Sequence, residues 1–249
     1  MRLGISGTYS SGKTLTALAL SHYIGLPRTM ARTMREILPD AAPGKKLEEC
    51  TAAELLQMIV VRHTERVKYE HQLAGGFISD GSSLQEWIYG ALRVRVGINP
   101  NDSVALGEAD VERTAELAFF DDVMRQLGVS FKQHVQRGFD AFVHLRNELP
   151  LSADGHRPVN DRFRTLADAR LLEVMAELRI PVHVVSGTMP ERLRAIAAAT
   201  GLRPITTEEQ AAAAAQAEYR RIDTTIETRR TAAPDGRPPV HRPVARSGA

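Results

Sequence analysis

The 249-residue sequence contains one cysteine, Cys50, so it can form neither an internal disulfide framework nor a cysteine-rich zinc site. Its longest apolar stretch, residues 55–61, is far shorter than a membrane-spanning helix requires, and no transmembrane segment is expected. No charged and then apolar leader precedes the first expected strand, which together with the lone cysteine favours a cytoplasmic protein. A formal net charge of +2 is too small to indicate a nucleic-acid partner.

A hydrophobic content of 43% over this length is enough for a sizeable core in one domain, which we place at residues 1–205. Residues 206–249 are expected to form an Ala-rich polar helix that begins at Thr206 or Thr207 and reaches Arg221, followed by a tail. Residues 232–249 consist largely of Arg, Pro, Ala and Gly without apolar periodicity, and we expect them to be disordered. A solvated tail is favoured over one that binds an acidic partner.

The central motif is GTYSSGKT at residues 7–14, which satisfies the phosphate-loop pattern G-x-x-x-x-G-K-[ST] at every specified position. Glycines at both ends allow backbone N–H groups to approach a polyphosphate closely, and the helix that follows directs its positive end toward the anion. An accidental match is the alternative, but it would arise by chance in roughly one chain per hundred. We therefore predict that ATP is bound by Gly7, Thr8, Tyr9, Ser10, Ser11, Gly12, Lys13 and Thr14.

Short apolar runs alternate with long helical segments through the rest of the chain. This order predicts a parallel sheet with helices on both faces, that is, a three-layer α/β P-loop NTPase fold of the nucleoside/nucleotide kinase-like type with about five strands. The expected strands are residues 2–6, 26–30, 77–80, 139–145 and 182–186. Between the third and fourth, residues 111–128 are expected to form a helix and a further helical piece to end near Gly138.

Asp80 directly follows a buried strand, so a neighbouring strand would bring its carboxylate beside the phosphate loop. There it could hold Mg²⁺ together with Thr14, or accept the proton of an attacking hydroxyl. The alternative is a simple Asp-Gly turn at the end of a strand. Gly81 follows in place of the Glu expected of a motor ATPase, and the Asn-Lys-x-Asp motif of GTPases is absent, so phosphoryl transfer is favoured. No histidine pair has metal-ligand spacing, and Mg²⁺ is the only metal expected.

Arginines crowd the segment of residues 150–164, which we expect to act as a lid. Arg157 and Arg162 are predicted to neutralise charge in the transition state, while Arg164 is expected to point away from the site. A solvated arginine loop is the alternative. Arg32 and Trp87 are candidate acceptor contacts; a surface position for Arg32 and a core position for Trp87 are the alternatives.

The order of these motifs resembles the small P-loop kinases related to the ribosylnicotinamide kinase domain of the bacterial NAD-biosynthesis regulator, an AAA-type ATP-binding, nucleoside/nucleotide kinase-like family. The resemblance spans about residues 1–200. It rests on the phosphate loop, Met30-Ala31-Arg32, Arg62-His63, Asp80 with Tyr89, Asp154-Gly155-x-Arg157 after Pro150, and Val184-Val185-Ser186-Gly187. It implies ATP- and Mg²⁺-dependent phosphorylation of a nucleoside-like hydroxyl, with Asp80 near the acceptor, Arg157 and Arg162 in the lid, and His63 among the acceptor contacts.

Three positions depart from the pattern of this family, namely Thr29 in place of an acidic residue, His63 in place of Gln and Leu151 in place of an aromatic residue. Because such positions tend to face the acceptor, nicotinamide riboside itself should not be assumed. The sequence thus predicts a phosphotransferase that acts on a small molecule. Its rival is a regulatory ATP-hydrolysing switch that signals through its tail; assembly into a homodimer is left open.

Overall fold

Four parallel strands form the central sheet of the computed structural model, which describes residues 1–73, 75–100, 111–151 and 160–221. Their order across the sheet is β2-β1-β3-β4, so the first strand lies between the second and the third. In the register, Ile5 is opposite both Asp80 and Val143. The strands are β1 (Arg2–Ser6), β2 (Phe77–Asp80), β3 (Ala141–Leu145) and β4 (Val182–Val185).

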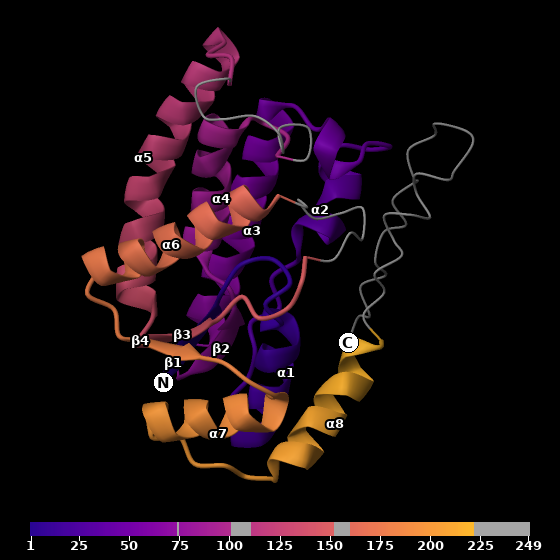
Figure 1. Ribbon diagram of the computed structural model, residues 1–249, viewed down its shortest axis with the longest axis vertical. Coiled ribbons are helices and arrows are strands. Elements are labelled where there is room, and N and C mark those ends of the chain that lie inside the picture. Colours follow the sequence, from indigo (N-terminus) through magenta and orange to yellow (C-terminus); the bar gives the residue numbers. More distant parts are fainter. Residues whose placement is uncertain (74, 101–110, 152–159, 222–249) are drawn as a thin grey trace, which may run out of the picture.

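Helices cover both faces of the sheet and give the expected three layers (Figure 1). One face carries α2 (Met34–Ala41), α3 (Ala52–Gln72), α4 (Ser83–Val96), α5 (Ala115–Gly138) and α6 (Asp161–Glu177). The other carries α1 (Lys13–Ile24), α7 (Met189–Thr200) and α8 (Glu208–Tyr219). A 3₁₀ turn, Leu47–Glu49, leads into α3, whose start is fixed by a capping box formed by Thr51 and Glu54.

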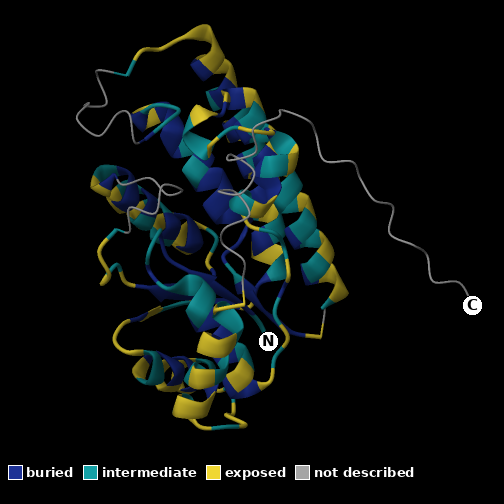
Figure 2. Ribbon diagram, turned by 90° about the vertical axis from the view of Figure 1, so that its right-hand side faces the viewer, coloured by how far each residue is buried: buried dark blue, intermediate teal, exposed yellow. Residues whose placement is uncertain are grey.

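Strands β1, β2 and β3 are buried on both sides because their side chains alternate between two hydrophobic clusters, whereas the edge strand β4 is partly exposed. Phe77 and Phe142 pack among the helices α2 to α6, while Leu3, Ile5 and Ile78 pack against α1 and its neighbours. Figure 2 shows the sheet as a dark blue layer with helices on either side. Continuous apolar strands of this kind are typical of a parallel sheet, and the fold class predicted from the sequence is confirmed.

The predicted strand at residues 26–30 is reduced to one parallel bridge between Arg28 and Ile78 at the outer edge of β2. Thr29 N donates to Ile78 O over 2.9 Å, and Ile78 N donates to Pro27 O over 2.9 Å. Pro27 has no N–H and cannot donate the next hydrogen bond of a parallel ladder, so the pairing does not extend from this bridge toward the N-terminus of the segment. The sheet therefore has four strands in place of about five.

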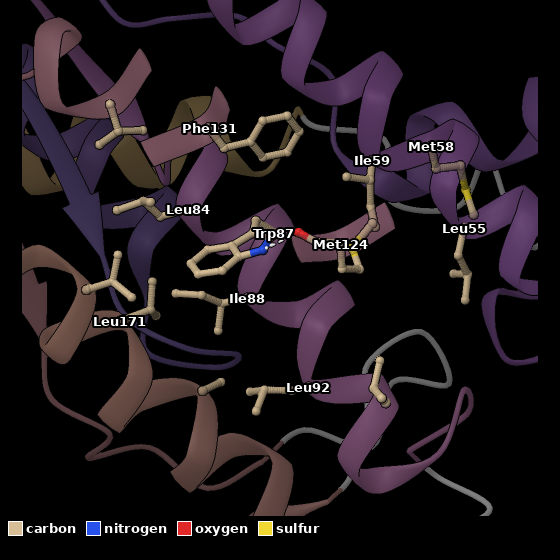
Figure 3. Packing of buried hydrophobic residues seen from close by; sticks show 14 of the residues in the cluster. Leu55, Met58, Ile59, Leu84, Trp87, Ile88, Leu92, Met124, Phe131 and Leu171 are labelled. Carbon is tan, nitrogen blue, oxygen red and sulfur yellow. Dashed lines mark hydrogen bonds between the residues drawn. The ribbon is translucent and has the colours of Figure 1, made fainter. Parts of the chain in front are cut away.

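Helix α5 runs unbroken to Gly138, although the sequence suggested two helical pieces that separate near Gly128. Gly128 has a packing role, because a Cβ added there would lie 2.6 Å from the indole ring of Trp87. The absence of a side chain lets α5 approach α4 closely, and Trp87 Nε1 donates to Met124 O over 2.8 Å (Figure 3). The glycine thus marks a helix contact and not a helix end.

Helix α8 packs along α1 and buries Ala211 and Ala215 in the second cluster. Glu218 near its end pairs with Arg28 over 2.6 Å and with His22 over 2.9 Å. The predicted polar helix is confirmed, while the domain boundary at residue 205 stays a prediction. Within the described part of the chain, no helix is long and apolar enough to cross a membrane.

Candidate nucleotide and phosphoryl-transfer site

The phosphate loop connects the carboxyl end of β1 to the first turn of α1. Gly7 and Gly12 have φ of 138° and 87°, values that side chains disfavour, and Ser10 between them is also left-handed with a φ of 59°. Successive peptides of changing hand form a concave backbone of the type that binds anions. Lys13, the first residue of the helix, lies over this loop with its Nζ 2.6 Å from Thr8 O.

Thr14 in α1 and Asp80 at the end of β2, the two predicted Mg²⁺ ligands, are in contact because the strands that precede them, β1 and β2, are neighbours. Thr14 Oγ1 donates to Asp80 Oδ2 over 2.6 Å. The approach follows from the register, in which Asp80 is opposite Ile5 and Gly81 N donates to Ile5 O over 3.0 Å. A hydroxyl and a carboxylate therefore meet beside the phosphate loop, and both are hard oxygen ligands of the kind that Mg²⁺ prefers.

A buried ionic cluster on α3 and α4 contacts the end of β2. The guanidinium of Arg66 on α3 donates to Asp80 O over 2.9 Å, to Ser79 Oγ over 3.3 Å and to Glu86 Oε1 over 3.0 Å. The side chains of Arg66 and Glu86 are 3% and 5% exposed, so this pair is almost dehydrated. Arg62 approaches the same carboxylate, with its Nε 2.7 Å from Glu86 Oε1. The cluster fixes the backbone at Asp80 from a helix that the motif does not include.

One of the two described lid arginines, Arg164, differs from its predicted position. Arg164 was predicted to point away from the site, and this is wrong: it is buried, with Nη2 2.9 Å from Leu149 O and Nε 3.4 Å from Thr8 Oγ1. Its reason is that α6 begins at the N-cap Asn160, whose side chain accepts from Phe163 N, so Phe163 and Arg164 both face inward. Arg162 is half-buried on the same helix, and Arg157 lies outside the described residues.

Three further side chains contact the loop without having been predicted as site residues. Gln85 on α4 donates from Nε2 to Gly7 O over 2.7 Å, and Arg192 on α7 donates from Nη1 to Ser11 O over 3.0 Å. Asn147, after β3, accepts a hydrogen bond from the Thr8 hydroxyl through Oδ1 over 2.5 Å. The rule that ligands bind at the carboxyl ends of parallel strands places residues 146–164 and 186–192 on this edge, which predicts the location of Asn147 and Arg192 but not their contacts.

Two of the predicted acceptor contacts, Trp87 and Arg32, are engaged by other residues of the protein. Trp87 is 8% exposed in the core, where Lys132 Nζ lies 4.7 Å from its ring centre, which is the alternative that the sequence left open. Arg32 is ion-paired with Glu65 over 2.7 Å and with Asp40 over 3.1 Å, and the hydrogen bond that it donates to Glu65 raises its pKa.

His63, the third predicted acceptor contact, lies beside α4, because its Nδ1 is 2.7 Å from the hydroxyl of Ser83 in the first turn of that helix. Its ring stacks on Phe131 at 3.9 Å, and burial, with help from His134, lowers its pKa to about 4. The imidazole is therefore neutral at pH 7 and available for hydrogen bonding, not for charge pairing.

Aromatic rings line the side of the loop that faces α4 and α6. Tyr9, within the loop, stacks on Tyr89 at 4.6 Å and on Phe163 at 6.1 Å. Burial raises the pKa of Tyr89 well above its ordinary value, so its hydroxyl stays protonated. The three rings thus pack on one another as an aromatic cluster beside the loop.

Comparison with known proteins agrees with this geometry. The chain is similar in structure to a deoxyadenosine kinase from M. mycoides with bound dCTP, at 14% sequence identity and a TM-score of 0.51, over 81% of this chain and 99% of that one. A search of curated proteins finds no match. A family profile described as an AAA domain matches residues 2–192, from the first strand into α7. The chain therefore belongs to this AAA-domain family, with a P-loop nucleoside kinase-like fold.

Proposed function

We propose that the protein transfers the γ-phosphate of ATP to a hydroxyl of a small molecule, most plausibly a nucleoside or nucleoside-like compound. The observation that carries this proposal is the contact of Thr14 and Asp80 beside Lys13, because a phosphate loop, a metal-binding hydroxyl and a carboxylate are the groups that phosphoryl transfer needs in one place. Similarity of fold to a deoxyadenosine kinase supports a nucleoside-like acceptor.

Each residue then has a separate task. The loop backbone holds the phosphates, and Lys13 turns from Thr8 O to the outer phosphates when ATP binds. Asp80 accepts the proton of the attacking hydroxyl, and Arg162 and Arg157 stabilise the charge that develops on the transferred group. Of the two described lid arginines, Arg164 donates a hydrogen bond to the hydroxyl of Thr8 and so stabilises the phosphate loop.

The donor set at the end of β2 fits Mg²⁺. Thr14 Oγ1 and an oxygen of Asp80 would hold the ion, which usually takes only one or two protein ligands and completes its shell with water and phosphate oxygens. Bound there, Mg²⁺ would neutralise negative charge on the phosphates during transfer.

For the acceptor we propose a chemical class and not one particular compound. Thr29, one of the departures from the ribosylnicotinamide kinase pattern, is buried and its hydroxyl donates to Ser79 Oγ over 3.1 Å, so it faces the interior of the sheet edge. His63 is occupied by Ser83 and Phe131. These positions do not support nicotinamide riboside in particular, and a nucleoside-like acceptor is the proposal that we retain.

The test is an acceptor screen. The full chain is incubated with ATP and Mg²⁺, with and without pooled nucleosides and related alcohols, and ADP release is followed. Acceptor-dependent release that disappears in Asp80→Asn supports the kinase, since asparagine can still accept from Thr14 but cannot take a proton. Hydrolysis that is indifferent to every acceptor and changes when residues 222–249 are deleted would instead support the regulatory switch.

A further inference from the structure

Arg192 ties together three loops at the carboxyl edge of the sheet. Its Nη1 donates to Ser11 O over 3.0 Å in the phosphate loop, its Nε to Gly187 O over 2.8 Å after β4, and its Nη2 to Glu148 Oε2 over 3.1 Å after β3. Glu148 Oε2 also accepts from Gly187 N over 2.9 Å and so closes the arrangement. With 5% exposure, Arg192 is far more buried than an arginine that serves only solubility.

The bond to Ser11 O acts on the orientation of a peptide plane. Because the peptide unit is planar and trans, the N–H of Gly12 points opposite to the carbonyl of Ser11. A guanidinium that holds this carbonyl outward therefore directs the Gly12 N–H to the inner side of the loop. The guanidinium also lies against the loop, since a Cβ added to Gly12 would be 3.1 Å from Arg192 Nη1.

Gln85 applies the same constraint at the other end of the loop. Its Nε2 holds Gly7 O over 2.7 Å, which by the same geometry directs the N–H of Thr8 inward. Its Oε1 accepts from Ser82 N over 3.0 Å at the N-terminus of α4, so the amide is fixed at both of its ends. The two residues come from helices on opposite faces of the sheet, α4 and α7.

We propose that Arg192 and Gln85 are positioning residues that hold the phosphate loop in its anion-binding form before nucleotide arrives. The inference rests on the proposed binding of ATP, but not on any acceptor. Prearranged N–H groups lower the ordering cost of binding, so the two side chains act on nucleotide affinity. They touch the inner phosphate cradle and not the transferred group, so their effect is equal for ATP and ADP.

The experiment measures binding of ATP and of ADP, each with Mg²⁺, by calorimetry on Arg192→Met and Gln85→Met. Arg194→Met is the matched control, because Arg194 is an exposed arginine on the same helix. Loss of a charged hydrogen bond should weaken both nucleotides by about 10- to 100-fold in Arg192→Met, and loss of a neutral one by about 2- to 10-fold in Gln85→Met. The control should stay within about twofold.

Turnover gives a second measurement once an acceptor is known. The KM for ATP should rise while kcat at saturating ATP stays within about twofold of wild type, as expected when only binding is weakened. Circular dichroism and thermal melting without nucleotide establish that each variant is folded. Arg192→Lys, which keeps the charge and can reach one carbonyl, should recover part of the affinity.

Unchanged affinity for both nucleotides in a folded Arg192→Met would overturn the proposal. So would a loss restricted to ATP, because that would mean that Arg192 contacts the terminal phosphate directly. Should Arg192→Met not fold, Arg192→Lys and Gln85→Met must both bind ATP and ADP more weakly, and wild-type affinity in either would be equally decisive. Failure of the kinase proposal looks different: nucleotide binding and its dependence on Arg192 would remain, without acceptor-dependent ADP release.

Discussion

Replacement of Arg66 by methionine tests the buried cluster behind Asp80. The guanidinium is almost fully buried and donates to Glu86, Ser79 and the carbonyl of Asp80. Removal of one member of a buried ion pair costs about 3–5 kcal/mol, because the remaining charge stays in a dehydrated site. Glu86 would still have Arg62 at 2.7 Å, so we expect the lower end, about 3 kcal/mol of the free energy of unfolding.

Replacement of the carboxylate of this cluster should lower the free energy of unfolding further than replacement of Arg66. Glu86→Leu leaves two guanidinium groups, those of Arg62 and Arg66, facing one another without their carboxylate. We expect about 5 kcal/mol or more, the upper end of the same range. Glu86→Leu is expected to cost more than Arg66→Met because two arginines share one carboxylate. No such difference would be expected for an isolated ion pair.

Urea unfolding, followed by circular dichroism, measures both losses, and an unchanged m-value would show that the unfolded state is unaffected. For a chain of this size, about 3 kcal/mol corresponds to a Tm lower by roughly 6–12 °C. Lys45→Met is the control: Lys45 pairs with Glu54 over 2.8 Å at the surface, and its loss should cost less than about 1 kcal/mol. If Arg66→Met costs no more than this control, or Glu86→Leu costs less than Arg66→Met, the cluster does not stabilise the strand end as we describe.

Three more outcomes are expected. Lys13→Ala should weaken ATP binding and turnover together. Asp80→Asn should still bind ATP and lose about 10²- to 10⁴-fold in the rate of phosphoryl transfer. Near wild-type turnover in Asp80→Asn would mean that Asp80 is not the catalytic carboxylate. Arg162→Ala should lower kcat by roughly a hundredfold, whereas Arg164→Ala should mainly lower the Tm because its buried guanidinium holds Leu149 O and Thr8; a kcat loss in Arg164→Ala alone would reverse these roles. His63 has a pKa of about 4 in the folded protein against 6.5 ordinarily, so the unfolded chain binds more protons between these two pH values. The free energy of unfolding should therefore fall as the pH drops from 6.5 toward 4. If the urea midpoint of His63→Gln falls as steeply as that of the wild type over this range, His63 is not the group responsible.

The sequence was most informative where function depends on local geometry. Gly7, Gly12, Lys13 and Thr14 lie within one loop, so their spacing alone predicted it, and Asp80 was predicted because it follows an apolar run. The parallel sheet followed from the alternation of strands and helices. Pro27 explains why the fifth strand is only a bridge, but a sequence pattern cannot show how far a short edge segment pairs.

Single polar residues on helices were the part that sequence reasoning missed. Arg66, Arg164 and Arg192 are buried and contact the site or its supports, yet each looks like an ordinary surface arginine in the sequence. Their positions depend on which helix faces the strand ends, which is a tertiary property. For Trp87 the sequence left a choice, because an aromatic residue in the first turns of the helix after Asp80 suits either a substrate contact or the core. Its burial and the close approach of Gly128 place it in the core.

The packing of α8 on α1 changes what should be regarded as the folding unit. Helix α1, which carries Lys13 and Thr14, is apolar on nearly every side, since residues such as Ala17, Leu18 and Leu20 are fully buried. A sheet can cover only one side of such a helix, and α8 covers part of the remainder although it lies beyond the family match at residue 192. A chain cut at residue 205 would leave the helix of the phosphate loop partly exposed to solvent, so we expect a chain that ends after α8, at Tyr219, to be the more stable of the two.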